Sequence, residues 1–179
     1  MGGLLSYLWG GTPASTEREE VDPATGLSPK ERKLVQDTWK LVNQDAKGNG
    51  VALFMALFKA YPHYQREFPS LAKIPLSELA TSKKMIAHAN TVMYSLTSVI
   101  DNLSDPECLQ EMLQKIGENH GRRKTGQRPF LDLKGVFIQL LQGKLGKQMT
   151  PQAIVAWGKT VDVMYAGIFK GLDITSEDD

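Results

Sequence analysis

Apolar residues recur at steps of three and four over most of this chain, which is the spacing of amphipathic helices. The segments that carry this spacing are 28–46, 51–61, 77–101, 105–120, 129–144 and 150–170. No segment alternates apolar and polar residues as a strand does, and neither a glycine-rich phosphate loop nor an internal repeat is present in the sequence. The sequence therefore predicts an all-α packed globule and argues against nucleotide-binding α/β folds and solenoids.

The length of 179 residues and the apolar content of 41% suit one domain with a real core. Residues 1–27 differ from the rest, because an apolar tip gives way to a glycine-, proline- and polar-rich stretch. The apolar tip consists of Leu4, Leu5, Tyr7, Leu8 and Trp9. We expect a flexible leader over 1–27, the folded domain over 28–172 and an acidic tail over 173–179.

The charges are almost balanced, with 21 Lys and Arg against 20 Asp and Glu and a net charge of +1. This balance offers no basic field for a nucleic acid, which is excluded as a partner. The single cysteine, Cys108, cannot form an intramolecular disulfide, so a reducing compartment is expected. No apolar run approaches the ~20 residues that span a bilayer, and no secretory signal begins the chain. A cytoplasmic location is therefore expected.

Two of the three histidines, His88 and His120, fall on the apolar sides of separate predicted helices. A neutral imidazole is the stable form there, and it can ligate iron or simply be a hydrogen-bonded core residue. A protein-only zinc site has less support, since Cys108 lies twelve positions before His120 and neither histidine has a carboxylate one turn away. Heme needs only one or two axial ligands from the protein. His63, beside Pro62, is expected at the surface.

An ordered set of landmarks resembles the globin family over residues 27–171. The landmarks are Leu27-Ser28 with Trp39 twelve residues later, 57–62, Phe68-Pro69, His88 with Val92, 113–120, Thr150-Pro151 and 157–159. The resemblance implies the globin fold, a 3-on-3 helical sandwich around a heme pocket, with heme b (iron protoporphyrin IX) as the cofactor. Dioxygen and other diatomic gases are the implied ligands.

The resemblance also implies residue roles. His120 would be the fifth ligand of the iron, with its second ring nitrogen held by an acceptor such as the Ile116 carbonyl. His88 would stand on the distal side, either donating a hydrogen bond to a bound gas or binding the iron itself. The remaining pocket residues would be Phe68 flat against the heme, Val92 beside the gas, Phe54 facing the distal side, and Leu133 and Phe137 from a later helix.

Two features depart from the family pattern. Leu71 stands where many globins carry a second aromatic residue near the heme edge, and the turn after His120 is longer than in myoglobin. In that turn, Arg122 or Arg123 is a candidate partner for a heme propionate, and solvated surface charges are the alternative for at least one of them.

The first six residues, Met1-Gly2-Gly3-Leu4-Leu5-Ser6, fit the N-myristoylation pattern, with Gly2 as the acceptor. One acyl chain binds membranes only marginally, so the apolar tip would supply the second contribution. The alternative is an unmodified tail whose apolar tip packs on the domain or a partner. Membrane attachment through the leader and association into a homodimer are both left open.

The primary functional interpretation is reversible oxygen binding for carriage, storage or supply, rather than enzymatic catalysis. A second interpretation is a membrane-tethered redox heme protein with bis-histidyl iron, of the nitric oxide dioxygenase or nitrite reductase type. A third is a heme-free helical adaptor. The presence of both histidines at the family positions argues against the third interpretation.

Overall fold

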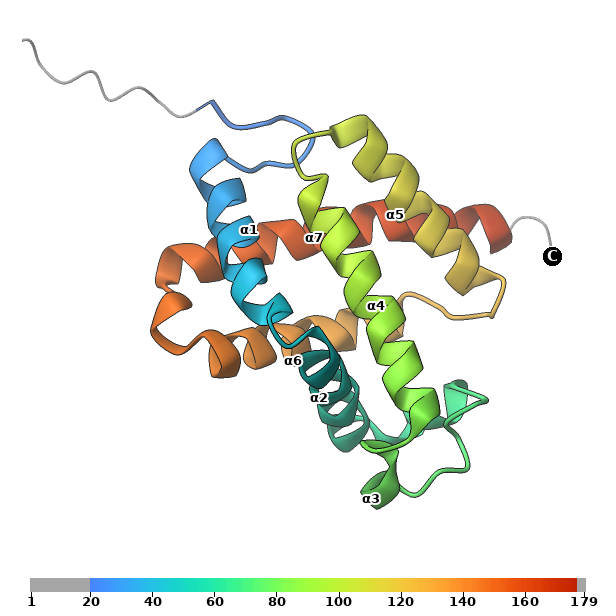
Figure 1. Ribbon diagram of the computed structural model, residues 1–179. Helices are drawn as coiled ribbons and strands as arrows, with labels where there is room; N and C mark the ends of the chain where they lie inside the picture. Colours follow the sequence, from blue (N-terminus) through green and yellow to red (C-terminus); the bar gives the residue numbers. More distant parts are fainter. Residues whose placement is uncertain (1–19, 177–179) are drawn as a thin grey trace, which may run out of the picture.

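The structure is a computed structural model that describes residues 20–176, and the part of the chain that it describes is helical without strands (Figure 1). The α-helices are α1 (Pro29–Asn43), α2 (Ala46–Ala60), α3 (Leu76–Leu79), α4 (Lys83–Asp101), α5 (Pro106–Gly121), α6 (Arg128–Leu145) and α7 (Pro151–Ser176). Two 3₁₀ helices, η1 (Pro62–Glu67) and η2 (Gly146–Gln148), join them. The all-α prediction is confirmed.

The start of α1 follows from a capping box. The Ser28 side chain accepts a hydrogen bond from the backbone N–H of Glu31, and the Glu31 carboxylate accepts one from the backbone N–H of Ser28. Pro29 occupies the first turn, where a missing N–H costs nothing. Leu27, just before the cap, is fully buried, so the domain contacts begin before the helix does.

Three predicted helix limits were wrong. Helix α2 begins at Ala46 rather than after the glycines, because the Asp45 side chain accepts from the N–H of Gly48 and caps it. The predicted helix 77–101 is two elements, with a break between Leu79 and Lys83. Helix α7 continues to Ser176, beyond the expected end at residue 170 and into the predicted acidic tail.

The helices form two crossing layers. Figure 1 shows α1, α4 and α5 in front of α6 and α7, which run behind them at a steep angle. Helix α5 packs mainly on α7, whereas α4 packs mainly on α2. The two front helices α4 and α5 therefore have different main packing partners, and this arrangement positions the site described below. No helix in the described range 20–176 is long and apolar enough to cross a bilayer.

An aromatic cluster joins α1, α6 and α7 away from that site. Trp157 packs against Trp39 and Phe137, with ring centroids 5.9 and 5.6 Å apart. The indole N–H of Trp157 donates to the hydroxyl of Thr38 at 3.0 Å, so the buried nitrogen is satisfied. Both tryptophans are almost completely buried, so this cluster is part of the core that holds the two layers together.

Candidate functional site

His120 lies in the last turn of α5, with its Nδ1 atom 2.8 Å from the carbonyl oxygen of Ile116. A carbonyl oxygen can only accept, so Nδ1 must carry the proton in this contact. The Nε2 lone pair of a neutral ring is then left available for a metal. The ring packs edge-on against Phe130 at 5.1 Å, and this contact fixes its orientation from the α6 side.

His88 lies on α4 and is half-buried between two aromatic edges. Its ring centroid is 4.7 Å from that of Phe54 on α2 and 5.2 Å from that of Phe68 after η1. Burial lowers the pKa of His88, and electrostatic interaction with the nearby His120 and Arg123 side chains lowers that pKa further. The neutral imidazole is therefore favoured, which leaves a ring nitrogen free to accept or ligate.

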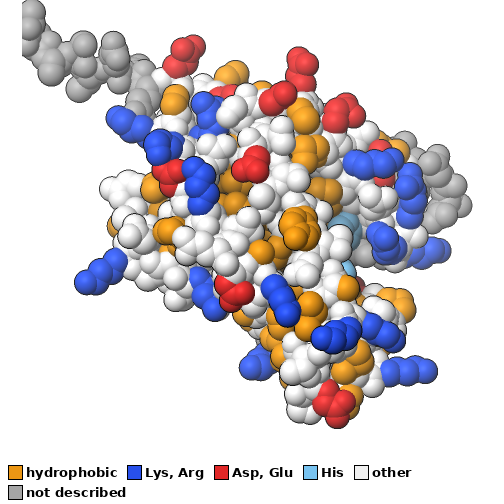
Figure 2. Space-filling view, viewed as in Figure 1, with side chains coloured by type: hydrophobic (Ala, Val, Ile, Leu, Met, Phe, Trp, Pro, Cys, Tyr) orange, Lys and Arg blue, Asp and Glu red, His pale blue; other side chains and the backbone are white. Residues whose placement is uncertain are grey.

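His120, in the last turn of α5, lies close enough to His88 on α4 to be among the causes of its lowered pKa. Four of the predicted site residues pack on the core and remain partly exposed: Phe68, Val92, Ile116 and Leu133. Figure 2 shows histidine side chains in a hollow on this face, with Lys and Arg on either side of it. Basic side chains therefore flank the histidines on this face.

The predicted site residues fall into two groups. Phe54 and Phe68 lie against His88, and the bond between His120 and the Ile116 carbonyl that the sequence led us to expect is present. Phe137 is different, because it belongs to the aromatic cluster with Trp39 and Trp157. The structure therefore does not bring Phe137 together with the histidines.

Sequence reasoning missed Phe130, whose ring contacts His120 and also lies 5.8 Å from Tyr165 and 6.0 Å from Phe169. The available signal was its place in the first turn of a helix whose start was predicted at Pro129. Phe130 contacts His120, and Tyr165 and Phe169 pack against Phe130. These ring contacts connect α6 and α7 to the end of α5.

The structure also places the residues that depart from the family pattern and the third histidine. Leu71 is fully buried among core residues, so its side chain replaces an aromatic ring with aliphatic packing. His63 is exposed, as predicted. Arg122 pairs with Glu118 at 3.5 Å, and the Arg123 guanidinium donates to the backbone carbonyl of Asn119. Both arginines are exposed.

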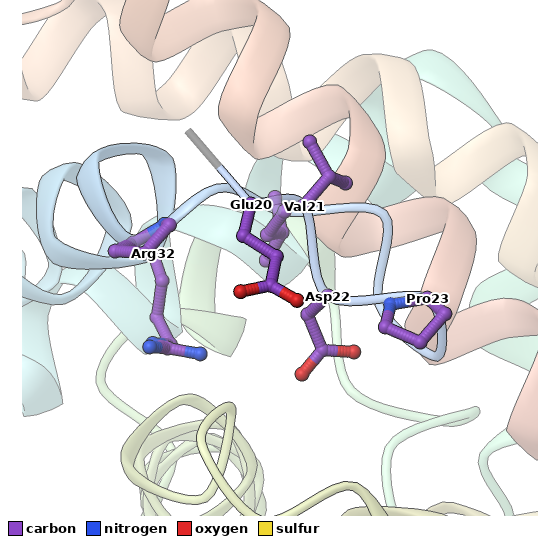
Figure 3. A pocket seen from close by; sticks show the side chains of 7 residues that line it. Glu20, Val21, Asp22, Pro23 and Arg32 are labelled. Atoms are coloured by element: carbon purple, nitrogen blue, oxygen red, sulfur yellow. The ribbon is translucent and has the colours of Figure 1, made fainter. Parts of the chain in front are cut away.

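A second hollow, of about 310 Å³, lies at the start of α1. It is lined by Glu20, Val21, Asp22, Pro23, Leu27, Pro29 and Arg32. Figure 3 shows the charged side chains of Glu20, Asp22 and Arg32 extending to the same side of the ribbon. None of these residues is a histidine or cysteine, and the hollow does not include the histidine site.

Within residues 20–176, no three His, Cys, Asp or Glu side chains gather where they could hold a metal ion alone. The histidines instead offer a free imidazole nitrogen on His120 and a half-buried His88 whose neutral form is favoured, and both rings pack against aromatic side chains. A flat, apolar cofactor that brings its own four metal-binding nitrogens matches this set of groups. The fold and the site together define an all-helical protein with a two-histidine, heme-type pocket.

Comparison with known proteins identifies the family. Residues 51–168 match the globin family. Globin-1 of Anadara inaequivalvis is 31% identical over 147 residues, which cover 82% of this chain and 97% of that protein. Cytoglobin-2 of Danio rerio is 28% identical over 150 residues, covering 83% of this chain and 82% of that protein. The chain belongs to the globin family.

The architecture agrees with that membership. The hexacoordinate hemoglobin of Drosophila melanogaster superposes with a TM-score of 0.76 at 26% identity, covering 80% of this chain and 94% of that chain. The predicted globin fold is therefore confirmed. Family membership and the likeness to a heme protein support heme binding by this chain.

Proposed function

We propose that the protein binds dioxygen reversibly, at the iron of a heme b ligated by His120 and faced by His88. The observation that carries this proposal is the hydrogen bond from His120 Nδ1 to the Ile116 carbonyl, because it leaves Nε2 as the ligand. When bound, the heme supplies an iron with an open or exchangeable coordination position for a diatomic gas. Carriage, storage or supply of oxygen is the simplest role, because it needs no electron donor or second substrate.

The residues of the chain would divide the work. His120 would hold the cofactor, and the Ile116 carbonyl would keep its ring in one orientation and raise its basicity. His88 would present an N–H donor to the gas, in an environment that Phe54 and Phe68 keep apolar. A hydrogen bond made in such a dry environment is worth on the order of 1–3 kcal/mol when the acceptor carries charge.

A second candidate is a redox role in which both histidines bind the iron. The observation that favours it is the position of His88, which packs against Phe54 and Phe68 and lies near enough to His120 for the two side chains to interact electrostatically. The hemoglobin of Drosophila melanogaster named above is described as hexacoordinate. Nitric oxide dioxygenation and nitrite reduction are the reactions that such a site would suit.

We also propose a cytoplasmic location with attachment to membranes through a myristoylated Gly2. This residue lies outside the part of the chain that the structure describes, and the proposal rests on the motif of the first six residues. Mass spectrometry of the protein from its native cell should find an N-terminal peptide that begins at Gly2 and carries a myristoyl group. An unmodified Gly2 would remove the lipid anchor.

Visible absorption spectroscopy tests the main proposal. The purified protein is measured in the ferric state, then after reduction by dithionite, and then under carbon monoxide. A Soret band with a broad, high-spin reduced spectrum is expected for an open oxygen site. Sharp, resolved low-spin bands in the reduced protein would favour the redox role, and no Soret band even after added hemin would leave the heme-free adaptor.

A further inference from the structure

The turn between α5 and α6 carries a cluster of basic residues followed by a threonine, and the proposed heme site assigns no role to that threonine. Arg122-Arg123-Lys124 precede Thr125, and these two arginines are the only adjacent pair in the chain. No other serine or threonine of the sequence has arginine at both the second and third preceding positions. Arginine forks pair with carboxylates in a fixed bidentate geometry, which is how an acidic enzyme groove recognises a basic substrate.

Thr125 is partly exposed, and its hydroxyl differs from most other threonine hydroxyls of the described chain in its hydrogen bonding. Five other threonines donate their hydroxyl hydrogen to a backbone carbonyl within their own segments: Thr38, Thr81, Thr91, Thr97 and Thr160. The Thr125 hydroxyl makes no such bond within residues 20–176, and only its backbone N–H is engaged, with the carbonyl of His120 at 3.1 Å. The three basic side chains before it are exposed, and so is Gly126 after it.

The backbone of this turn contains one residue in an unfavourable conformation. Lys124 has a φ of 60°, the only positive φ of a non-glycine residue in the described range. L-amino acids adopt this left-handed conformation at a cost, which an extended chain relieves. A Cβ added at Gly126 would meet no atom within 4 Å, so the chain there has open space around it. Entry into a binding groove would break the backbone hydrogen bonds from Lys124 to Gly121 and from Thr125 to His120, while the exposed residues on either side of Thr125 carry no core packing.

We propose that Thr125 is a phosphorylation site for a basophilic protein kinase, which recognises Arg122 and Arg123. The kinase would transfer the γ-phosphoryl group of ATP to the Thr125 hydroxyl oxygen. The new bond joins that oxygen to phosphorus, and the bond from phosphorus to the β,γ-bridging oxygen breaks to release ADP. The hydroxyl proton passes to the catalytic aspartate of the kinase.

The phosphate would change how the end of α5 is held. It adds about −1.5 to −2 charges. The added charge would lie near Arg122 and Arg123, which contact α5 in the unmodified protein. Arg122 pairs with Glu118, and Arg123 donates to the Asn119 carbonyl, so both would be drawn from the last helical turn toward the phosphate. The added anion also lies beside the negative end of the helix dipole. The turn that carries His120 is therefore held less firmly after phosphorylation.

The first experiment maps the phosphate. The folded, full-length holoprotein is incubated with ATP and the catalytic subunit of a basophilic kinase such as cyclic-AMP-dependent protein kinase, and the products are analysed by tandem mass spectrometry. One phosphate on Thr125 is expected, lost in Thr125→Ala and kept in Thr125→Ser. The double variant Arg122→Lys, Arg123→Lys keeps the positive charges but lacks the bidentate guanidinium groups. It should be phosphorylated roughly tenfold more slowly.

Arg128→Lys is the matched control, because this arginine lies in the same basic region but follows the hydroxyl. It should react like the wild type. Phosphate at another residue, no phosphate on Thr125 of the folded protein, or equal rates for the double variant and the control would overturn the proposal.

The second experiment measures the consequence, which rests on the proposed heme function. Loss of heme to an excess of a scavenging apoprotein should be roughly two- to fivefold faster for phosphorylated protein than for the same protein before treatment. An unchanged rate would overturn the coupling to His120. Because the phosphate map does not depend on heme, failure of the heme proposal and failure of the phosphorylation proposal are distinguished.

Discussion

The Nδ1 atom of His120 lies 2.8 Å from the carbonyl oxygen of Ile116, one helical turn earlier in α5. A carbonyl oxygen has two lone pairs, so the Ile116 carbonyl within α5 can accept a hydrogen bond from a side chain one turn later as well as from the helix backbone. The contact selects the tautomer with a free Nε2 and restricts rotation of the ring. One local bond thus prepares the histidine for a metal before any cofactor is present.

Replacing this histidine should abolish stable heme retention. His120→Ala removes the free nitrogen that we propose as the fifth ligand of the iron. We expect gel filtration of the hemin-reconstituted variant to separate the heme from the protein. His63→Ala is the control, because His63 is exposed, and it should retain heme as the wild type does. Normal retention in His120→Ala would mean that another residue is the ligand.

Replacing the opposite histidine should alter gas binding more than heme retention. His88→Leu removes the N–H donor but keeps an apolar side chain against Phe54 and Phe68. Loss of a hydrogen bond worth about 1–3 kcal/mol corresponds to oxygen release that is roughly 5- to 150-fold faster. Stopped-flow displacement of oxygen by carbon monoxide measures this rate. An unchanged rate would mean that His88 does not contact the gas.

The sequence predicted those features that depend on local spacing. The apolar faces of the helices, the Ser28 start of α1 and the Ile116 partner of His120 all follow from positions three or four residues apart. The break before Lys83 was missed, because Leu79 continues the apolar pattern of α4 although the backbone does not continue the helix.

Contacts between distant segments could not be predicted in the same way. Helical periodicity indicates that Phe130 and Phe137 both face the interior, but not which neighbours each one meets. In the structure Phe130 lies against His120, while Phe137 lies against two tryptophans. The choice depends on the rotation and crossing position of α6 against α5, α1 and α7, which is set by packing of the whole domain.

The close approach of α5 to α7 should make Gly117 sensitive to a single methyl group. A Cβ at Gly117 would lie 2.0 Å from the carbonyl oxygen of Ile168, so the two helices would have to separate. We expect Gly117→Ala to lower the free energy of unfolding by about 1–3 kcal/mol. Denaturant unfolding monitored by circular dichroism measures the change.

Gly135 in α6 is the matched control for that experiment. It is exposed, and an added Cβ would meet nothing within 4 Å. Gly135→Ala should therefore raise the free energy of unfolding by about 0.5–1 kcal/mol, since alanine loses less backbone entropy in a helix. If both alanine variants were equally stable, the close helix crossing would be wrong.

The capping carboxylate of Glu31 should make stability depend on pH. Burial raises the pKa of Glu31, but the hydrogen bonds with Lys159 and the Ser28 backbone lower it more, so the net pKa lies below 4.5. A carboxylate with a depressed folded-state pKa contributes stability above its unfolded pKa, and this contribution is lost as the pH falls through the folded-state value. The unfolding free energy should therefore decline between about pH 5 and pH 3.

Glu31→Gln should weaken that decline while keeping the shape of the side chain. Lys159, which donates to Glu31 from α7, is partly exposed, so solvent screening limits the loss at pH 7 to about 0.5–1 kcal/mol. The control is Glu111→Gln, at an exposed position on α5. Urea unfolding at pH 7, 5 and 4 gives the slopes. A Glu31→Gln variant that loses stability with acid as steeply as the control would show that other carboxylates carry the dependence. A shallower slope would identify the bond between α1 and α7 as one source of acid sensitivity.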